Sequence, residues 1–150
     1  MLRLFITISL FFLSISVAAM DIESACKERD EQKKALLSNM STSISEALLV
    51  GQCTGYHQTS YTEYRASSLE ELPQACSEFV EQKEALLPFD MSTTLSEAML
   101  AGMCLGAIYK VAESCEIEEY QIKYLYIAKN IKGLNERQSV FRIAEHFDCR

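Results

Sequence analysis

The chain has 150 residues, of which 49% are hydrophobic and 23% are charged, a composition typical of one globular domain. Lys and Arg total 14 against 21 Asp and Glu, which gives a net charge of −7 at pH 7. Proteins that bind nucleic acid or an anionic membrane surface present a basic face, so this acidic balance argues against both kinds of partner.

The first 19 residues have the pattern of a secretory signal. Arg3 precedes residues 4–17, which are almost all apolar, and Val17-Ala18-Ala19 is a small-residue pattern that signal peptidase accepts. The apolar run is short for a helix that crosses a bilayer of about 30 Å. We therefore expect cleavage after Ala19 rather than an uncleaved anchor. No second apolar run is expected to be long enough to span a membrane.

The exported part contains an internal duplication. Residues 25–37 match residues 75–87 at 9 of 13 positions, and residues 40–55 match residues 91–106 at 10 of 16. Self-similarity at a fixed offset indicates a repeated structural unit. We therefore expect a single domain, residues 20–150, made of unit one (21–66), unit two (67–114) and C-terminal helices (115–150).

Each unit has the pattern of a helix, a short loop and a second helix. Ser43 with Glu46, and Thr94 with Glu97, are capping boxes that predict the start of the second helix in each unit. The first helix of unit two should begin within two or three residues of Pro73, although Ser68 with Glu71 also resembles a cap. It should end near Leu87, because Pro88 disfavours helical geometry at the residue before it.

The second helix of each unit carries two glycines. They are Gly51 and Gly55 in unit one, and Gly102 and Gly106 in unit two. Glycine inside a helix costs roughly 1 kcal/mol relative to alanine. A close approach between helices would explain that cost, because a small face lets two backbones come together. A glycine-lined ligand groove is the alternative.

The tail contains two further amphipathic segments. The first ends at Gly133 and the second lies just before Cys149. The apolar positions at helical spacing are Ile122, Leu125, Ala128 and Ile131 in the first, and Val140, Phe141, Ala144 and Phe147 in the second. No segment shows sustained alternation with period two. The predicted fold is all-α, a disulfide-stapled bundle of five or six helices.

Six cysteines lie in the exported part, and an even number in an oxidising compartment predicts three disulfides. The duplication gives Cys26 and Cys53 the same positions in unit one that Cys76 and Cys104 have in unit two. The simplest scheme joins the two helices within each unit, Cys26 to Cys53 and Cys76 to Cys104. It leaves Cys115 to pair with Cys149.

The exported part contains no recognisable catalytic or cofactor motif. Nucleophile elbows, zinc-protease motifs, phosphate-binding loops and dinucleotide fingerprints are all missing. No cysteines have the Cys-x-x-Cys spacing, and only His57 and His146 offer imidazole ligands. We therefore expect neither an enzyme, nor a metal site, nor a cofactor.

Two polar, tyrosine-rich stretches are candidate partner-binding surfaces. One contains His57, Tyr61 and Tyr64, and tyrosine combines contact area with a hydroxyl group. The other is acidic and contains Glu116, Glu118, Glu119 and Tyr120, which suits a basic partner. The alternatives are an amphipathic helix end with Tyr56 and Tyr64 partly buried, and a solvated helix start.

The span from Ala75 to Cys149 resembles the Rap/Tai-type immunity proteins of bacterial type VI secretion systems. The matching features are Cys76, the sequence Cys104-Leu-Gly106-Ala-Ile-Tyr109, Cys115, Tyr124-Leu125 and Phe147-Asp148-Cys149. Unit one carries Cys53-Thr-Gly55-Tyr56, which is closer to the family's Cys-x-Gly-Tyr. The chain departs from the family at Ala107 and Asp148, and lacks its Gly-Val-x-Asp and His-Pro elements.

The resemblance implies a periplasmic protein of a Gram-negative bacterium. Its partner would be a cognate toxin, such as a peptidoglycan amidase, whose cleft it blocks without being a catalyst itself. A homodimer stays open as a second kind of association. Two functions of other classes stay open. One is a small periplasmic acid-stress chaperone, because many carboxylates would be neutralised at low pH, and the other is a helical ligand-binding protein with a cavity between the duplicated units.

Overall fold

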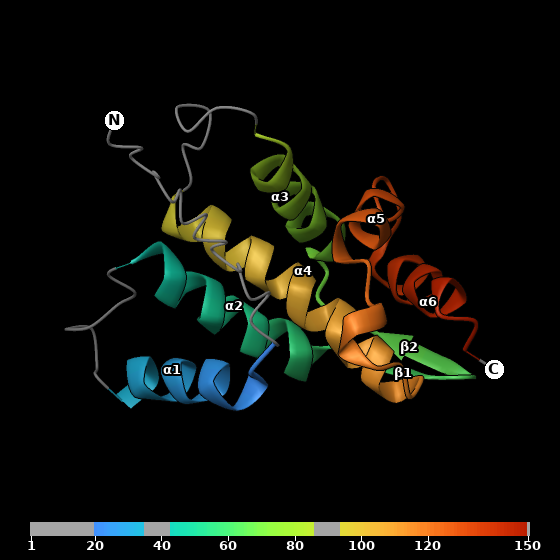
Figure 1. The fold of residues 1–150 in the computed structure, drawn as a ribbon, viewed down its shortest axis with the longest axis horizontal. Coiled ribbons are helices and arrows are strands. Elements are labelled where there is room, and N and C mark those ends of the chain that lie inside the picture. The colour runs from blue at the N-terminus through green and yellow to red at the C-terminus, as the bar shows by residue number, and fades with distance from the viewer. Residues whose placement is uncertain (1–19, 35–42, 86–93, 150) are drawn as a thin grey trace, which may run out of the picture.

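The computed structural model describes residues 20–34, 43–85 and 94–149, and the predicted signal peptide lies outside these ranges. The described residues form a helical bundle with a small antiparallel hairpin (Figure 1). The elements are α1 (Ile22–Lys34), α2 (Ile44–Gln58), β1 (Ser60–Thr62), β2 (Arg65–Ser67), α3 (Leu72–Glu84), α4 (Leu95–Ser114), η1 (Glu119–Gln121), α5 (Tyr124–Lys129) and α6 (Glu136–His146). The predicted all-α, disulfide-stapled bundle is confirmed.

Both predicted capping boxes are present. The backbone N–H of Glu46 donates to Ser43 Oγ at 3.2 Å, and the N–H of Ser43 donates to the Glu46 carboxylate at 3.2 Å. Thr94 and Glu97 make the same two bonds at 3.2 and 2.7 Å. Each box satisfies two backbone donors that a helix start leaves without a partner, so α2 and α4 begin at equivalent positions of the two units.

The glycines of α2 and α4 bring the two helix backbones into direct contact. A methyl group added to Gly51 would lie 2.0 Å from the carbonyl oxygen of Met99, and one on Gly55 would lie 2.0 Å from that of Met103. Contacts therefore advance in the same direction along both helices, so α2 and α4 run parallel. The predicted close approach is confirmed, and a small residue every fourth position is the pattern that permits it.

This packing has approximate two-fold symmetry. Gly102 faces the carbonyl of Leu48 and Gly106 faces that of Gln52, which are the same contacts with the roles of the two units exchanged. The helices α1 and α3 flank the central α2 and α4 pair on opposite sides (Figure 1). The duplication in the sequence thus becomes a two-fold relation in space.

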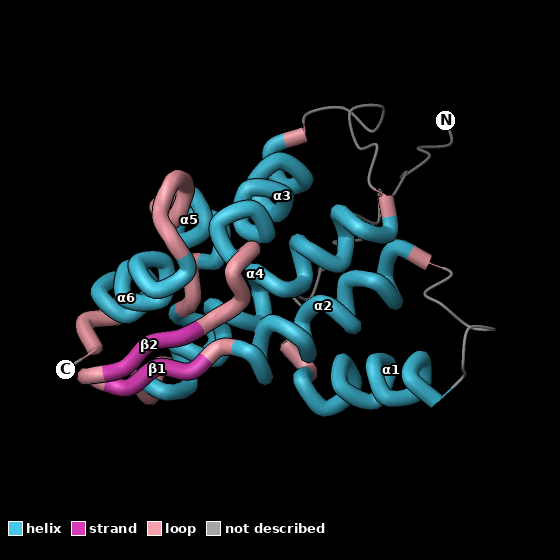
Figure 2. Tube along the Cα trace, turned by 180° about the vertical axis from the view of Figure 1, so that it is seen from behind, coloured by secondary structure: helices cyan, strands magenta, loops and turns pink. Residues whose placement is uncertain are grey.

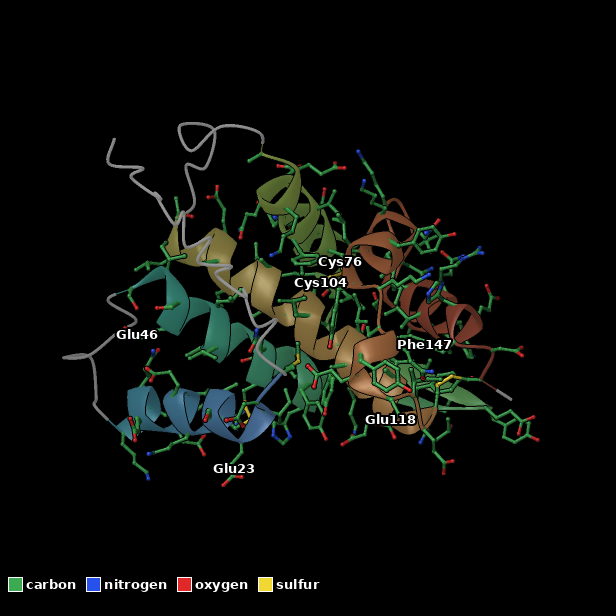
Figure 3. The ribbon with its side chains drawn as sticks, viewed as in Figure 1. Glu23, Glu46, Cys76, Cys104, Glu118 and Phe147 are labelled. Atoms are coloured by element: carbon green, nitrogen blue, oxygen red, sulfur yellow. A yellow bond between two sulfur atoms is a disulfide. The ribbon has the colours of Figure 1, made fainter. Side chains whose placement is uncertain are left out.

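The three predicted disulfides are all present, and none of the six cysteines is free. Cys26–Cys53 ties α1 to α2 with a Cα separation of 4.9 Å, and Cys76–Cys104 ties α3 to α4 with one of 4.8 Å. The labels in Figure 3 place Cys76 and Cys104 between these two helices. Cys115–Cys149 joins the end of α4 to the end of the described chain. Such bonds are typical of proteins in oxidising compartments.

The tail covers one side of the bundle only. The helices α5 and α6 pack against α3 and α4, and the hydrophobic core lies between these four helices. Its fully buried members include Leu72, Ile108, Ile131 and Ile143. The helix α1 packs chiefly against α2 and has Ala25 as its buried residue. The core therefore belongs mainly to unit two and the tail.

The hairpin is the main departure from the predicted fold. The helix α2 ends at Gln58, and β1 and β2 pair with Tyr61 opposite Ala66 (Figure 2). Each strand has three residues, too few to show a period of two in the sequence. The hairpin packs on α4 and α6, which half-buries Tyr61 and Ala66.

The boundaries of α3 and α5 can be compared with their predicted positions. The helix α3 starts at Leu72, as the position of Pro73 predicted, but Ser68 does not cap it, since Ser68 Oγ donates to the carbonyl of Leu69. It ends at Glu84, and the predicted end near Leu87 lies outside the described residues. The helix α5 is shorter than predicted, because Ile131 belongs to the turn that closes at Gly133 with φ 80°.

Among the described residues, α4 is the one helix that is long and apolar enough to cross a membrane. The expectation that no later run meets this criterion was wrong for Leu95–Ser114. This helix runs through the centre of the bundle, and 56% of its most apolar window is buried inside the protein. Its apolar character is that of a core helix.

Candidate partner-binding surface

The parallel packing of α2 and α4 places their C-terminal ends side by side, where four polar side chains interact. The Tyr56 hydroxyl donates to Glu113 Oε2 at 2.7 Å, and Lys110 Nζ donates to the same oxygen at 2.6 Å. Lys110 also lies over the Tyr56 ring, 4.6 Å from its centroid. His57 stands edge-on to Tyr56 with a centroid separation of 5.3 Å. These contacts join the two units at this end of the molecule.

The contacts shift the pKa values of these groups. The hydrogen bond from Lys110, together with the one from Tyr56, lowers the pKa of Glu113 below its ordinary value. The same bond to Glu113 raises the pKa of Lys110. Burial and the bond to Glu113 raise the pKa of the Tyr56 hydroxyl. At neutral pH the cluster therefore consists of a carboxylate, an ammonium group and a neutral phenol.

Two further tyrosines extend this cluster toward the tail. The rings of Tyr109 and Tyr56 lie 6.1 Å apart. Burial, reinforced by the nearby carboxylates Glu119 and Glu113, raises the pKa of Tyr109. Burial and Glu119 also raise the pKa of Tyr124 far above its ordinary value, and its buried hydroxyl has no hydrogen-bond partner among the described residues. Glu119 is thus close to tyrosines from both α4 and α5.

The first predicted surface is divided by the hairpin. His57 remains exposed at the end of α2, whereas Tyr61 is half-buried and stands edge-on to Phe141 at 6.1 Å. Tyr64 lies in the turn between β1 and β2 and is 84% exposed. The alternative of a helix end with Tyr56 and Tyr64 partly buried holds for Tyr56, which is half-buried near the end of α2, but was wrong for Tyr64, because the chain reverses direction there. Tyr64 is the residue of this stretch best placed to contact a partner.

The second predicted surface follows α4. It contains the start of η1, a short 3-10 helix, and no α-helix begins at these glutamates. Glu116 has φ 56°, in the left-handed region, and Glu118 precedes the short η1. Glu119 accepts a hydrogen bond from the backbone N–H of Met20, across 99 positions of sequence. Tyr120 is 84% exposed. Figure 3 shows Glu118 beside the C-terminal end of α4.

We use the name tyrosine end for the exposed residues of the two predicted surfaces, which follow the ends of α2 and α4 and include the turn of the hairpin. Its exposed members are His57, Tyr64, Glu116, Glu118 and Tyr120. Tyr109, Lys110 and Glu113, which hold the ends of α2 and α4 together, were not predicted as site residues. Lys110 and Glu113 are a visible i,i+3 pair. Their contact with Tyr56 depends on the register between two helices, which no local pattern encodes.

One group of side chains has the elements of a metal site. Ligand atoms of Cys26, Cys53 and His57 lie within 4.8 Å of one another. The two sulfur atoms are bonded to each other, and metal coordination by cysteine requires thiolates. The donor set of the oxidised protein therefore does not fit a metal ion.

Comparison with known proteins leaves the family open. No family model, no curated protein and no solved structure matches the chain. The resemblance to immunity proteins therefore rests on the cysteine and helix pattern described above. The site must be interpreted from its own geometry.

Proposed function

We propose that this protein is an exported immunity protein, which binds a toxic cell-wall-degrading effector and blocks its cleft. The observation that carries the proposal is the tyrosine end, where Tyr64 and Tyr120 are each 84% exposed and each follows a glutamate in the sequence. Tyrosine is enriched at protein interfaces because it contributes a large rigid contact area and a hydroxyl group.

The scaffold beneath the tyrosine end also supports binding. Disulfides fix the helices, and the Tyr56, Lys110 and Glu113 contacts join the ends of α2 and α4. A preorganised surface loses little conformational entropy when a partner binds. The net charge of −7 would accelerate association with a basic effector. In this function the cysteines act as covalent supports and the protein is not a catalyst.

The proposal predicts that cells lacking this protein are killed by sibling cells that carry the secretion system. A plasmid copy of the wild-type gene should restore survival, whereas the double variant Tyr64→Ala and Tyr120→Ala should not. Lys27→Glu with Lys34→Glu, two changes on exposed positions of α1, is the matched control and should protect fully. Deletion cells that survive the attack would contradict the proposal.

A second candidate function has its own supporting observation. Two grooves with apolar linings, of about 620 and 500 Å³, flank the α2 and α4 pair, and such volumes suit small amphiphilic ligands. A helical carrier would retain its ligand during purification. Native mass spectrometry of protein from the periplasm should then show a bound species, and an unmodified mass would exclude this alternative.

A further inference from the structure

The larger groove lies in unit one, between α1 and the first turns of α4, with the outer face of α2 as its floor. Val50, Leu95 and Met99 supply apolar surface. Its edge carries Arg29 and Lys33, and no carboxylate lines it in the described part of the chain. Arg29 forms an ion pair with Asp30 at 3.2 Å, whereas Lys33 has no ion-pair partner among the described residues. In an acidic protein this is a local positive edge.

The two-fold relation gives this groove a counterpart in unit two. By the duplication, Lys33 and Thr54 of the unit-one groove correspond to Lys83 and Leu105, and both of these line the unit-two groove. The counterpart has a volume of about 500 Å³. The same architecture therefore produces a groove on each side of the central helix pair.

The unit-two groove has additional walls from other parts of the same chain. Its lining includes Glu119, Tyr124 and Leu125 from the tail and Met20 with Asp21 from the N-terminal side. An ion pair between Lys129 of α5 and Glu84 of α3 holds the tail nearby. An acidic residue that accepts a hydrogen bond from the Met20 nitrogen, an aromatic and an aliphatic side chain thus border this groove together with Lys83. No tail element packs in the equivalent place on unit one.

We propose that the unit-one groove binds an acidic amphipathic segment of a partner protein, one that presents a carboxylate together with an aromatic and an aliphatic side chain. The segment would lie across α1, α2 and α4, in the place that corresponds to where Glu119, Tyr124 and Leu125 border the unit-two groove. Its carboxylate would meet Lys33 and Arg29, and its apolar side chains would cover Val50, Leu95 and Met99. This surface is separate from the tyrosine end and does not depend on the identity of an effector.

The chain itself supplies the probe. A fluorescently labelled synthetic peptide with the sequence of residues 116–126 carries three carboxylates, Tyr124 and Leu125. Titrated with the oxidised protein at low salt, its fluorescence anisotropy should rise to saturation. Higher salt should weaken binding, because the ionic contacts lie at the edge of an open groove. A peptide with Tyr124→Ala and Leu125→Ala should not bind.

Charge reversal in the groove is the decisive variant. Arg29→Glu with Lys33→Glu should weaken peptide binding by roughly tenfold or more, since two attractions become repulsions. The matched control, Lys27→Glu with Lys34→Glu, makes the same charge change on α1 at positions that do not line the groove, and should bind as wild type.

A second pair of variants tests the apolar floor without disturbing the core. Leu95 and Ile44 occupy equivalent first positions of α4 and α2, and are 41% and 44% exposed. Leu95 lines the unit-one groove, whereas Ile44 lines neither groove. Leu95→Asp should abolish peptide binding and Ile44→Asp should leave it unchanged. Circular dichroism should show that both variants fold.

Three outcomes would overturn the proposal. Binding that is lost in Lys83→Glu but kept in the Arg29 and Lys33 variant would mean that the peptide displaces the tail from unit two. Binding of laurate, but not of the peptide, with the same dependence on Lys33 would identify a lipid site. A dimer in sedimentation equilibrium that the Arg29 and Lys33 variant dissociates would make a second copy the occupant.

Discussion

Four glycine positions determine how closely the two units approach. Each glycine of α2 and α4 lies where a side-chain carbon would be 2.0 to 2.1 Å from a backbone carbonyl oxygen of the other helix. Such a contact involves backbone on both sides, so neither helix can yield without moving as a whole. The roughly 1 kcal/mol that glycine costs in a helix is therefore offset by the packing it permits.

Alanine substitutions should expose the two-fold relation at the level of single residues. Gly51→Ala and Gly102→Ala should each lower the free energy of unfolding by about 1 to 3 kcal/mol, because the helices must separate. The two values should be similar, since the two glycines make equivalent contacts. Urea unfolding followed by circular dichroism measures both. A stabilising effect of either substitution would show that the helices do not touch there.

Glu113 should make the stability of the protein depend on pH. Its hydrogen bonds lower its pKa in the folded state, so its contribution is present above the unfolded pKa and lost as the pH falls through the folded pKa. In Glu113→Gln, urea midpoints should therefore fall less than in wild type between about pH 5 and pH 3. Parallel curves for the two proteins would mean that the Lys110 and Tyr56 contacts do not persist in solution.

At the scale of elements, α1 differs from its counterpart α3. The helix α3 buries Leu72, Ala75, Cys76 and Phe79, whereas α1 buries Ala25 and relies on the disulfide to α2. The tail packs on α3 but not on α1. Helices that bury little apolar surface open locally at small free-energy cost. The Cys26–Cys53 bond is therefore the main attachment of α1, and the unit-one groove depends on it.

The Cys26–Cys53 bond should mainly attach α1, whereas the Cys76–Cys104 bond should stabilise the whole core, and removing one disulfide at a time distinguishes the two effects. Cys26→Ala with Cys53→Ala should release α1, seen as fast amide hydrogen exchange in Ile22–Lys34, while the rest of the protein stays protected. Cys76→Ala with Cys104→Ala should lower global stability by about 2 to 5 kcal/mol, because both cysteines are fully buried in the core. Slow exchange in α1 without its disulfide would contradict this account.

The sequence predicted most of the helices because their signals are local. The two capping boxes, Pro73 and the apolar spacing of α4 and α6 each lie within one element. The hairpin escaped prediction because three-residue strands are stabilised by contacts with α4 and α6. The Asn135 and Gln138 capping box of α6 is also a local signal in the sequence, but it was not among the predicted caps. The grooves and the Tyr56 contacts depend on packing between units, and no local signal encodes that packing.

At the scale of the whole molecule, the N-terminal side and the tail meet over the unit-two groove. The backbone nitrogen of Met20 donates to Glu119, and both residues line that groove. If the signal is removed after Ala19, this nitrogen becomes the α-ammonium group, and the hydrogen bond becomes an ion pair. Cleavage of the signal would then strengthen the contact between Met20 and Glu119 at the edge of the unit-two groove.

This contact can be tested in the protein that begins at Met20. Glu119→Gln keeps an oxygen that accepts the hydrogen bond but removes the negative charge, so it should lower the free energy of unfolding by about 0.5 to 1 kcal/mol, the usual contribution of a partly exposed ion pair. Glu118→Gln changes an exposed neighbour and is the matched control, expected within about 0.5 kcal/mol of wild type. Equal stability of the two variants would show that Met20 does not hold Glu119.

The whole account rests on two equivalent units, each closed by its own disulfide and packed about an approximate two-fold axis. The most direct test is a peptide map of the unreduced protein by mass spectrometry, combined with titration of free thiols. We predict no reactive thiol and three linked peptides, joining Cys26 to Cys53, Cys76 to Cys104 and Cys115 to Cys149. A bond between the units, such as Cys26 to Cys76, or several free thiols would contradict the scaffold and the binding function built on it.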